Sequence, residues 1–252
     1  MTRMHSATAR LLAAGTALAA SLVLATGARA QAPFDGSAYA FPVPDYVSTI
    51  VATNTLGQPS SGTGTKSKKK KHPKRVKHAT RQQLRALRYA PTSSVTESVY
   101  QRVVDQAGPG VDPATLHAQL DAAKAQFRAV LAKLGWSSND LGDMAAFVFL
   151  QGYVTWRENG VVPEQALAPL RRQVRDDLAL SRSVRRLSNA RKQEIAEILE
   201  LRTIFFLDSR NDAAAAGDSA GVAIARSQMR EWIESVYGVD VNDVRLTRQG
   251  VR

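Results

Sequence analysis

Residues 144 to 150 read Met-Ala-Ala-Phe-Val-Phe-Leu, and this run is apolar on every side of the helix it would form. A helix on the surface of a globular protein carries one apolar stripe, so a helix that is apolar all round is expected to be enclosed by others. The sequence therefore predicts a central helix that begins at Ser137 or Ser138 and stops at Asn159-Gly160.

Two helices are predicted before this central run. In the first, Ser94 and Glu97 have the spacing of an S-x-x-E capping box, and Gly108-Pro109-Gly110 ends the segment. The second begins with Asp112-Pro113, an N-cap followed by proline at the first helical position, and Gly135 supplies its end. Its apolar stripe consists of Leu116, Leu120, Phe127, Leu131 and Leu134.

Three further helices are predicted after it. Pro163 opens one that runs to about Leu180, with a break or kink expected at Pro169. The remaining two are capped by Ser188, reaching about Asp208, and by Asp218 or Ser219, ending at Tyr237-Gly238.

Burying all these stripes together predicts an all-α fold, a compact bundle of five or six helices over residues 89 to 252. No segment alternates with a period of two, apart from an ambiguous stretch from Val241 to Val251. The tail from Val239 to Arg252 has no clear period.

The N-terminal segment has the pattern of an export signal. Arg3 and Arg10 precede an apolar stretch, and Ala28-Arg29-Ala30 offers the small residues that signal peptidase reads. Residues 1 to 30 are interpreted as a cleaved secretory signal of a periplasmic or extracellular protein, the alternative being an uncleaved anchor. The sequence contains no cysteine, which excludes disulfides, thiol catalysis and Cys-ligated metal centres.

Charge divides the rest of the chain. The sequence holds 34 Lys and Arg against 22 Asp and Glu, but residues 89 to 252 carry 20 of each sign. Residues 31 to 65 have no basic side chain and are rich in Pro, Gly, Ser and Thr, which predicts an extended or disordered arm. Residues 66 to 88 form a polybasic linker with eleven basic side chains and no acid.

These eleven residues are the candidate anion-binding site. Near an anionic surface each contributes about 1 kcal/mol, so we expect weak, salt-sensitive attachment to an anionic envelope lipid, lipopolysaccharide, an acidic glycan or, non-specifically, DNA. The alternative is a solubilising linker, and the end of the tract is expected to become a short basic helix on contact with an anionic surface. The residues are Lys66, Lys68, Lys69, Lys70, Lys71, Lys74, Arg75, Lys77, Arg81, Arg85 and Arg88.

No catalytic, metal or cofactor site is predicted. His117 and Asp121 have the spacing of a surface i,i+4 pair, with acid/base chemistry as the less favoured alternative. Glu194, Glu197 and Glu200 are interpreted as surface charge on one solvated face. Arg202 falls on the apolar face of its helix, where its stem covers the core, or where it makes a buried ion pair or an anion pocket.

Three short segments suggest a relationship to known proteins. Residues 187 to 193, Leu-Ser-Asn-Ala-Arg-Lys-Gln, together with Tyr89-Ala90-Pro91 and residues 246 to 250, Leu-Thr-Arg-Gln-Gly, resemble a family of exported bacterial proteins that is classed only as a domain of unknown function. The resemblance implies export and a helical fold, and it brings no activity, ligand or functional residue.

The sequence thus favours a non-enzymatic exported helical protein that is attached through its polybasic segment. A partner-binding or chaperone-like helical module, with the basic tract as a spacer, is the first alternative. An enzyme with an unrecognised site near Arg202 or His117 is the second.

Overall fold

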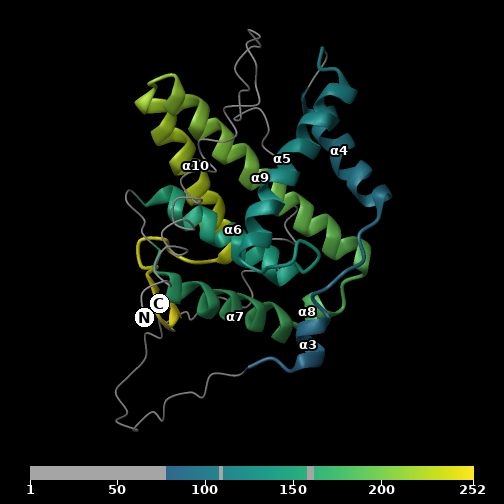
Figure 1. The fold of residues 1–252 in the computed structure, drawn as a ribbon, viewed down its shortest axis with the longest axis vertical. Coiled ribbons are helices and arrows are strands. Elements are labelled where there is room, and N and C mark those ends of the chain that lie inside the picture. Colours follow the sequence, from purple (N-terminus) through teal and green to yellow (C-terminus); the bar gives the residue numbers. More distant parts are fainter. Residues whose placement is uncertain (1–77, 108–109, 158–161) are drawn as a thin grey trace, which may run out of the picture.

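A computed structural model describes residues 78–107, 110–157 and 162–252, and the account below concerns these residues. Eight helices and two short strands lie in this part of the chain (Figure 1). Six of the helices have fifteen residues or more, which confirms the all-α fold and the predicted bundle of five or six helices. The elements are α3 (Arg81–Arg85), α4 (Ser93–Ala107), α5 (Pro113–Lys133), α6 (Leu141–Trp156), α7 (Glu164–Leu180), α8 (Arg182–Arg185), α9 (Asn189–Ala215), α10 (Ser219–Tyr237), β1 (Leu246–Thr247) and β2 (Gly250–Val251).

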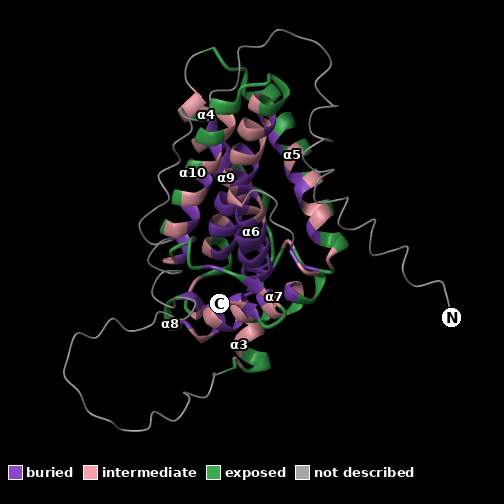
Figure 2. Ribbon diagram, turned by 90° about the vertical axis from the view of Figure 1, so that its left-hand side faces the viewer, coloured by how far each residue is buried: buried purple, intermediate pink, exposed green. Residues whose placement is uncertain are grey.

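Helix α6 lies at the centre of the bundle, as its apolar sequence predicts. All of its residues from Leu141 to Leu150 are buried, and it packs against α7, α9 and α10 (Figure 2). A Cβ atom at Gly152 would lie 2.6 Å from Cγ1 of Ile233 on α10, so glycine here permits the close approach of these two helices. The helix begins later than expected, because Asp140 rather than Ser137 or Ser138 caps it by accepting from the backbone N–H groups of Gly142 and Asp143.

The ends of α5 and α10 follow the sequence signals. Asp112 caps α5, with Pro113 in its first turn, and Gly135 follows the helix at φ +70°. Asp218 caps α10, and Gly238 ends it in the left-handed conformation at φ +61°. Such positive φ values favour glycine, because a Cβ atom strains the backbone there.

Besides the start of α6, three features of the helices differ from the predictions. Helix α4 begins at Ser93, so Ser94 lies inside the helix and the predicted capping box with Glu97 is wrong. Helix α7 runs through Pro169 without a break, and α9 continues through the Ala-rich segment to Ala215 instead of ending near Asp208. Alanine has the highest helix propensity, which favours this extension.

The C-terminal tail forms a small antiparallel hairpin from β1 and β2, which packs against α7. The side chain of Gln173 on α7 accepts a hydrogen bond from the Val251 backbone N–H at 3.0 Å and donates one to its carbonyl at 3.5 Å. This contact joins the end of the chain to the bundle.

The packed part of the chain begins upstream of residue 89. Leu87 is fully buried, Leu84 and Ala79 pack against the core, and α3 contacts α7. The predicted export signal, the arm and the lysines from 66 to 77 lie outside the described residues. None of the helices in residues 78–107, 110–157 and 162–252 has the length and apolar character needed to cross a bilayer.

Candidate functional site

Helix α3, the last part of the predicted anion-binding segment, is attached to the bundle at both ends. At its start, Nδ1 of His78 lies 2.8 Å from Oδ2 of Asp176, and the Ala79 backbone N–H donates to the other oxygen of the same carboxylate. Beyond its end, the Leu87 carbonyl accepts from the backbone N–H of Leu141 on α6. The helix is therefore part of the folded body.

The three arginines of this segment lie on its outer side. Leu84 and Leu87 pack inward, whereas Arg81, Arg85 and Arg88 are exposed. Arg88, whose side chain is 70% exposed, has Nε 3.8 Å from Oδ2 of Asp140. Neither of the other two arginines forms an ion pair with any residue that the structure describes. The expected short basic helix is thus present in the structure without any anionic surface.

A second group of exposed arginines, which the sequence analysis does not single out, lies on and beside α8. Arg182 and Arg186 are exposed and Arg185 is half-buried, while Val184 between them is fully buried and anchors the short helix. Helices α3 and α8 both contact α7, and both lie at the lower end of the molecule in Figures 1 and 2. Basic side chains from two distant segments of the sequence therefore lie at one end of the bundle.

Two buried carboxylates lie behind this end of the molecule. Asp143 accepts two hydrogen bonds of 2.7 Å from Nε and Nη2 of Arg171, and Asp140 accepts one of 2.8 Å from Nη2 of Arg175. Burial raises the pKa of Asp140, and the nearby Arg175 partly offsets this effect. Arg171 and Arg175 are therefore used to neutralise α6 acids, unlike the arginines of α3 and α8.

A larger polar network is buried between α4, α5 and α9. Nζ of Lys124 donates to Oε2 of Glu197 at 3.0 Å, and both side chains are at most 5% exposed. The other oxygen of Glu197 accepts from the Thr96 hydroxyl at 2.7 Å and from the Gln193 amide at 2.8 Å. Each oxygen of this buried carboxylate thus has a donor.

One turn further along the same helices, Arg128 makes a bidentate pair with Glu200. Its Nε and Nη2 each donate at 2.7 Å to one carboxylate oxygen, and Glu200 is completely buried. Burial raises the pKa of Glu200, and the two hydrogen bonds from Arg128 oppose that shift. Burial by itself would lower the pKa of the Arg128 guanidinium, but the hydrogen bond to Glu200 and the negative charges of Glu200 and Glu197 together outweigh it, so this pKa is raised.

The prediction that three glutamates of α9 lie on a solvated face is wrong for Glu197 and Glu200. Only Glu194 is half-buried at the surface, where bonds from Arg191 and Arg102 outweigh the effect of its burial and lower its pKa. The physical reason is that α5 places complementary cations opposite the other two acids. A network of this kind, with its donors and acceptors paired, is a structural element of the bundle core.

The remaining candidates lie in packing contacts. His117 and Asp121 do not form the predicted pair, because Asp121 accepts the hydroxyl hydrogen of Tyr100 at 2.6 Å and His117 Nδ1 lies 3.9 Å from Oε2 of Glu97. The guanidinium carbon of Arg202 lies 5.5 Å from the ring centroid of Phe206 and 5.8 Å from that of Trp232 on α10. Burial lowers the pKa of Arg202.

Metal chemistry has no candidate among the described residues, because no three acidic or histidine side chains there are grouped to hold an ion. Two acids outside the ion-pair networks have strongly raised pKa values. Burial raises the pKa of both Asp177 and Asp208 to about 7, with smaller contributions from the neighbouring Asp176 and Asp212.

Comparisons with known proteins bear on the family alone. No curated protein and no solved structure matches the chain. A family model described as a family of unknown function, DUF6683, matches residues 8–252. This match spans nearly the whole chain, including all the helices described above, so the protein belongs to the DUF6683 family.

Proposed function

We propose that the protein is a non-enzymatic exported helical protein whose polybasic segment, residues 66–88, attaches it electrostatically to an anionic envelope component or polymer. Residues 1–30 would direct export to the periplasm or the extracellular space. Lipid head groups, lipopolysaccharide phosphates, acidic glycans and DNA all offer the required negative charge.

The observation that carries this proposal is the position of the last three cations of the segment. If the tract served to neutralise acids of its own body, Arg81, Arg85 and Arg88 would be paired with carboxylates. Instead all three are exposed. Arg81 and Arg85 form no ion pair with any described residue, and Arg88 has a single 3.8 Å contact with Asp140, which already accepts a hydrogen bond from Arg175. The charges remain available to a partner.

The test is deletion of residues 66–77 from the chain that begins at residue 31, because this removes eight cations and leaves the His78 contact with Asp176 in place. At low salt we expect retention on heparin and on anionic vesicles to fall at least tenfold, since each engaged cation contributes about 1 kcal/mol near an anionic surface. Raising the salt concentration should also weaken the retention of the unmodified chain, because salt screens the attraction between exposed charges.

Deletion of residues 48–59 is the matched control, because that segment has the same length and no charged residue. The control should bind like the unmodified chain. Equal retention of both deletion variants would show that the tract is a spacer and would favour a partner-binding helical module.

A further inference from the structure

We propose that Arg182, Arg185 and Arg186 form a second, folded anion-binding site, which acts with the arginines on and just after α3 and binds a linear polyanion. The six side chains, here called the arginine face, are Arg81, Arg85, Arg88, Arg182, Arg185 and Arg186. This inference rests on the proposed function. It adds that the folded helical body, and not only the polybasic linker, contributes to binding the anion.

The charge of the helical body is balanced in total but uneven in distribution. Residues 171–192 contain eight basic and two acidic side chains. Arg171 and Arg175 neutralise buried acids of α6, so they are not part of the excess. Of the other six, Arg191 is paired with Glu194 and Lys192 is buried. Three of the remaining four, Arg182, Arg185 and Arg186, lie on and beside α8.

The two acids of this stretch do little to cancel that excess. Asp176 is already engaged by His78 and by the Ala79 backbone N–H. Burial, with a contribution from the Asp176 charge, raises the pKa of Asp177 to about 7, so near neutral pH this carboxyl carries only part of a charge. Within the described part of the chain, Arg182, Arg185 and Arg186 have no ion pair.

The residue type also favours a folded oxyanion site. The tract from 66 to 77 is mostly lysine, whereas every cation of the arginine face is arginine. A guanidinium presents a planar fork of donors that matches the oxygens of phosphate, sulfate or carboxylate groups. Buried Val184 and Leu87 fix the backbone behind the two groups of arginines, which reduces the ordering cost of binding.

A polymer fits this surface better than a bilayer does. Faces that bind bilayers usually insert large apolar side chains below the head groups. The exposed large hydrophobic residues of the described chain are Val111, which precedes α5, and Ile224 on α10, and neither belongs to α3 or α8. A long polyanion could instead engage the arginine face and the adjoining tract at once, so the two contributions would reinforce each other.

The test replaces Arg182, Arg185 and Arg186 with glutamine in the chain that begins at residue 31, and uses heparin and duplex DNA as probes. For DNA, we expect the slope of log K against log salt to become shallower by about 2 to 3, because each phosphate contact contributes about 0.9. At 50 mM salt the affinity for both polymers should fall at least fivefold.

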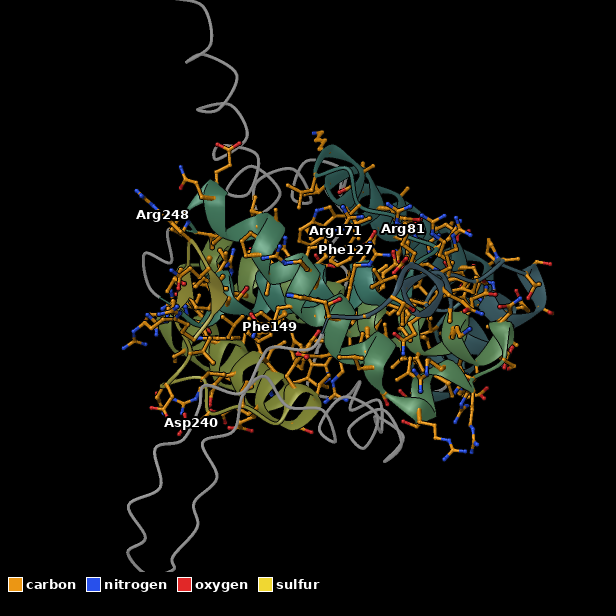
Figure 3. All side chains as sticks on the ribbon, turned by 90° about the horizontal axis from the view of Figure 1, so that it is seen from below. Arg81, Phe127, Phe149, Arg171, Asp240 and Arg248 are labelled. Carbon is orange, nitrogen blue, oxygen red and sulfur yellow. The ribbon has the colours of Figure 1, made fainter. Side chains whose placement is uncertain are left out.

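Replacing Lys133, Arg248 and Arg252 with glutamine is the matched control. It removes the same charge from exposed positions, and Figure 3 shows Arg248 at the left edge of the molecule, apart from Arg81. We expect less than a twofold change in affinity for this variant. Circular dichroism on both variants checks that the helices are intact.

An α8 variant that binds both polymers like the control would overturn this inference, whatever deletion of residues 66–77 does. Loss of retention on phosphatidylglycerol vesicles with unchanged polymer binding would also overturn it and identify a bilayer as the partner. Because the deletion leaves α8 untouched, the tract and the arginine face are tested separately.

Discussion

Replacing Lys124 with methionine is expected to destabilise the protein by about 3 to 5 kcal/mol, because it leaves the buried Glu197 carboxylate without its cation. Both side chains of this pair are almost completely enclosed, and Nζ lies 3.0 Å from Oε2. Methionine has a similar length and fills the same space, so the loss of stability is caused by the unpaired charge of Glu197 and not by a cavity. Urea unfolding followed by circular dichroism at pH 7 measures the effect.

Lys133→Met on the same helix is the matched control, because Lys133 is exposed, and its effect should stay within about 0.5 kcal/mol. Adding Glu197→Gln to Lys124→Met removes the unpaired charge and should restore more than half of the lost stability. A loss of less than about 1 kcal/mol in Lys124→Met would show that Thr96 and Gln193 alone satisfy the carboxylate.

Local sequence signals predict much of this fold because caps and apolar stripes depend on neighbouring residues. Asp112-Pro113, Asp218 and Gly238 mark helix ends through contacts within one turn, and the structure agrees at each. The central position of α6 follows from its composition alone, since a run that is apolar all round has to be enclosed. These inferences need no knowledge of which helices are neighbours.

The buried ion pairs could not be predicted in the same way, because they depend on which helices face each other. A hint is present in α5, where Lys124 occupies the position one turn after Leu120 and interrupts the apolar stripe before Phe127. Arg128 follows one turn later, with a spacing close to that of Glu197 and Glu200 on α9. Only the contact between α5 and α9 establishes that these charges meet.

The arginine face was missed for a related reason. Counting charges over residues 89 to 252 gives a balanced body, and this average hides the cluster near α8. The distant segment from Arg81 to Arg88 joins the cluster only because Asp176 and Leu141 hold α3 against the bundle. Net charge describes a chain, whereas a binding surface depends on which charges the fold brings together.

Asp208→Asn is expected to stabilise the protein by about 2 to 4 kcal/mol at pH 8, because it removes a buried carboxylate whose pKa is raised to about 7 from 3.8. Burial is the main cause of that shift, and the charge of Asp212 adds to it. Oδ1 of Asp208 is buried and accepts no hydrogen bond from any described residue. Thermal and urea unfolding at several pH values measure the gain.

The pH dependence provides the sharper test. The folded protein binds this proton more tightly than the unfolded chain, so the unmodified protein should lose stability as the pH rises from about 4 to about 7. Asp208→Asn should make that decline shallower. The remainder should reflect the other carboxyls whose pKa is raised, among them Asp177, whose pKa is also about 7, and Asp140, Glu200 and Asp212. Asp212→Asn is the comparison variant. It removes the neighbouring charge and a carboxyl whose pKa burial raises less than that of Asp208, so it should give a smaller gain. If Asp208→Asn instead destabilised the protein at pH 8, the carboxylate would have to make a favourable interaction in its charged form, and the interpretation of Asp208 as an unfavourably placed, partly buried acid would be wrong.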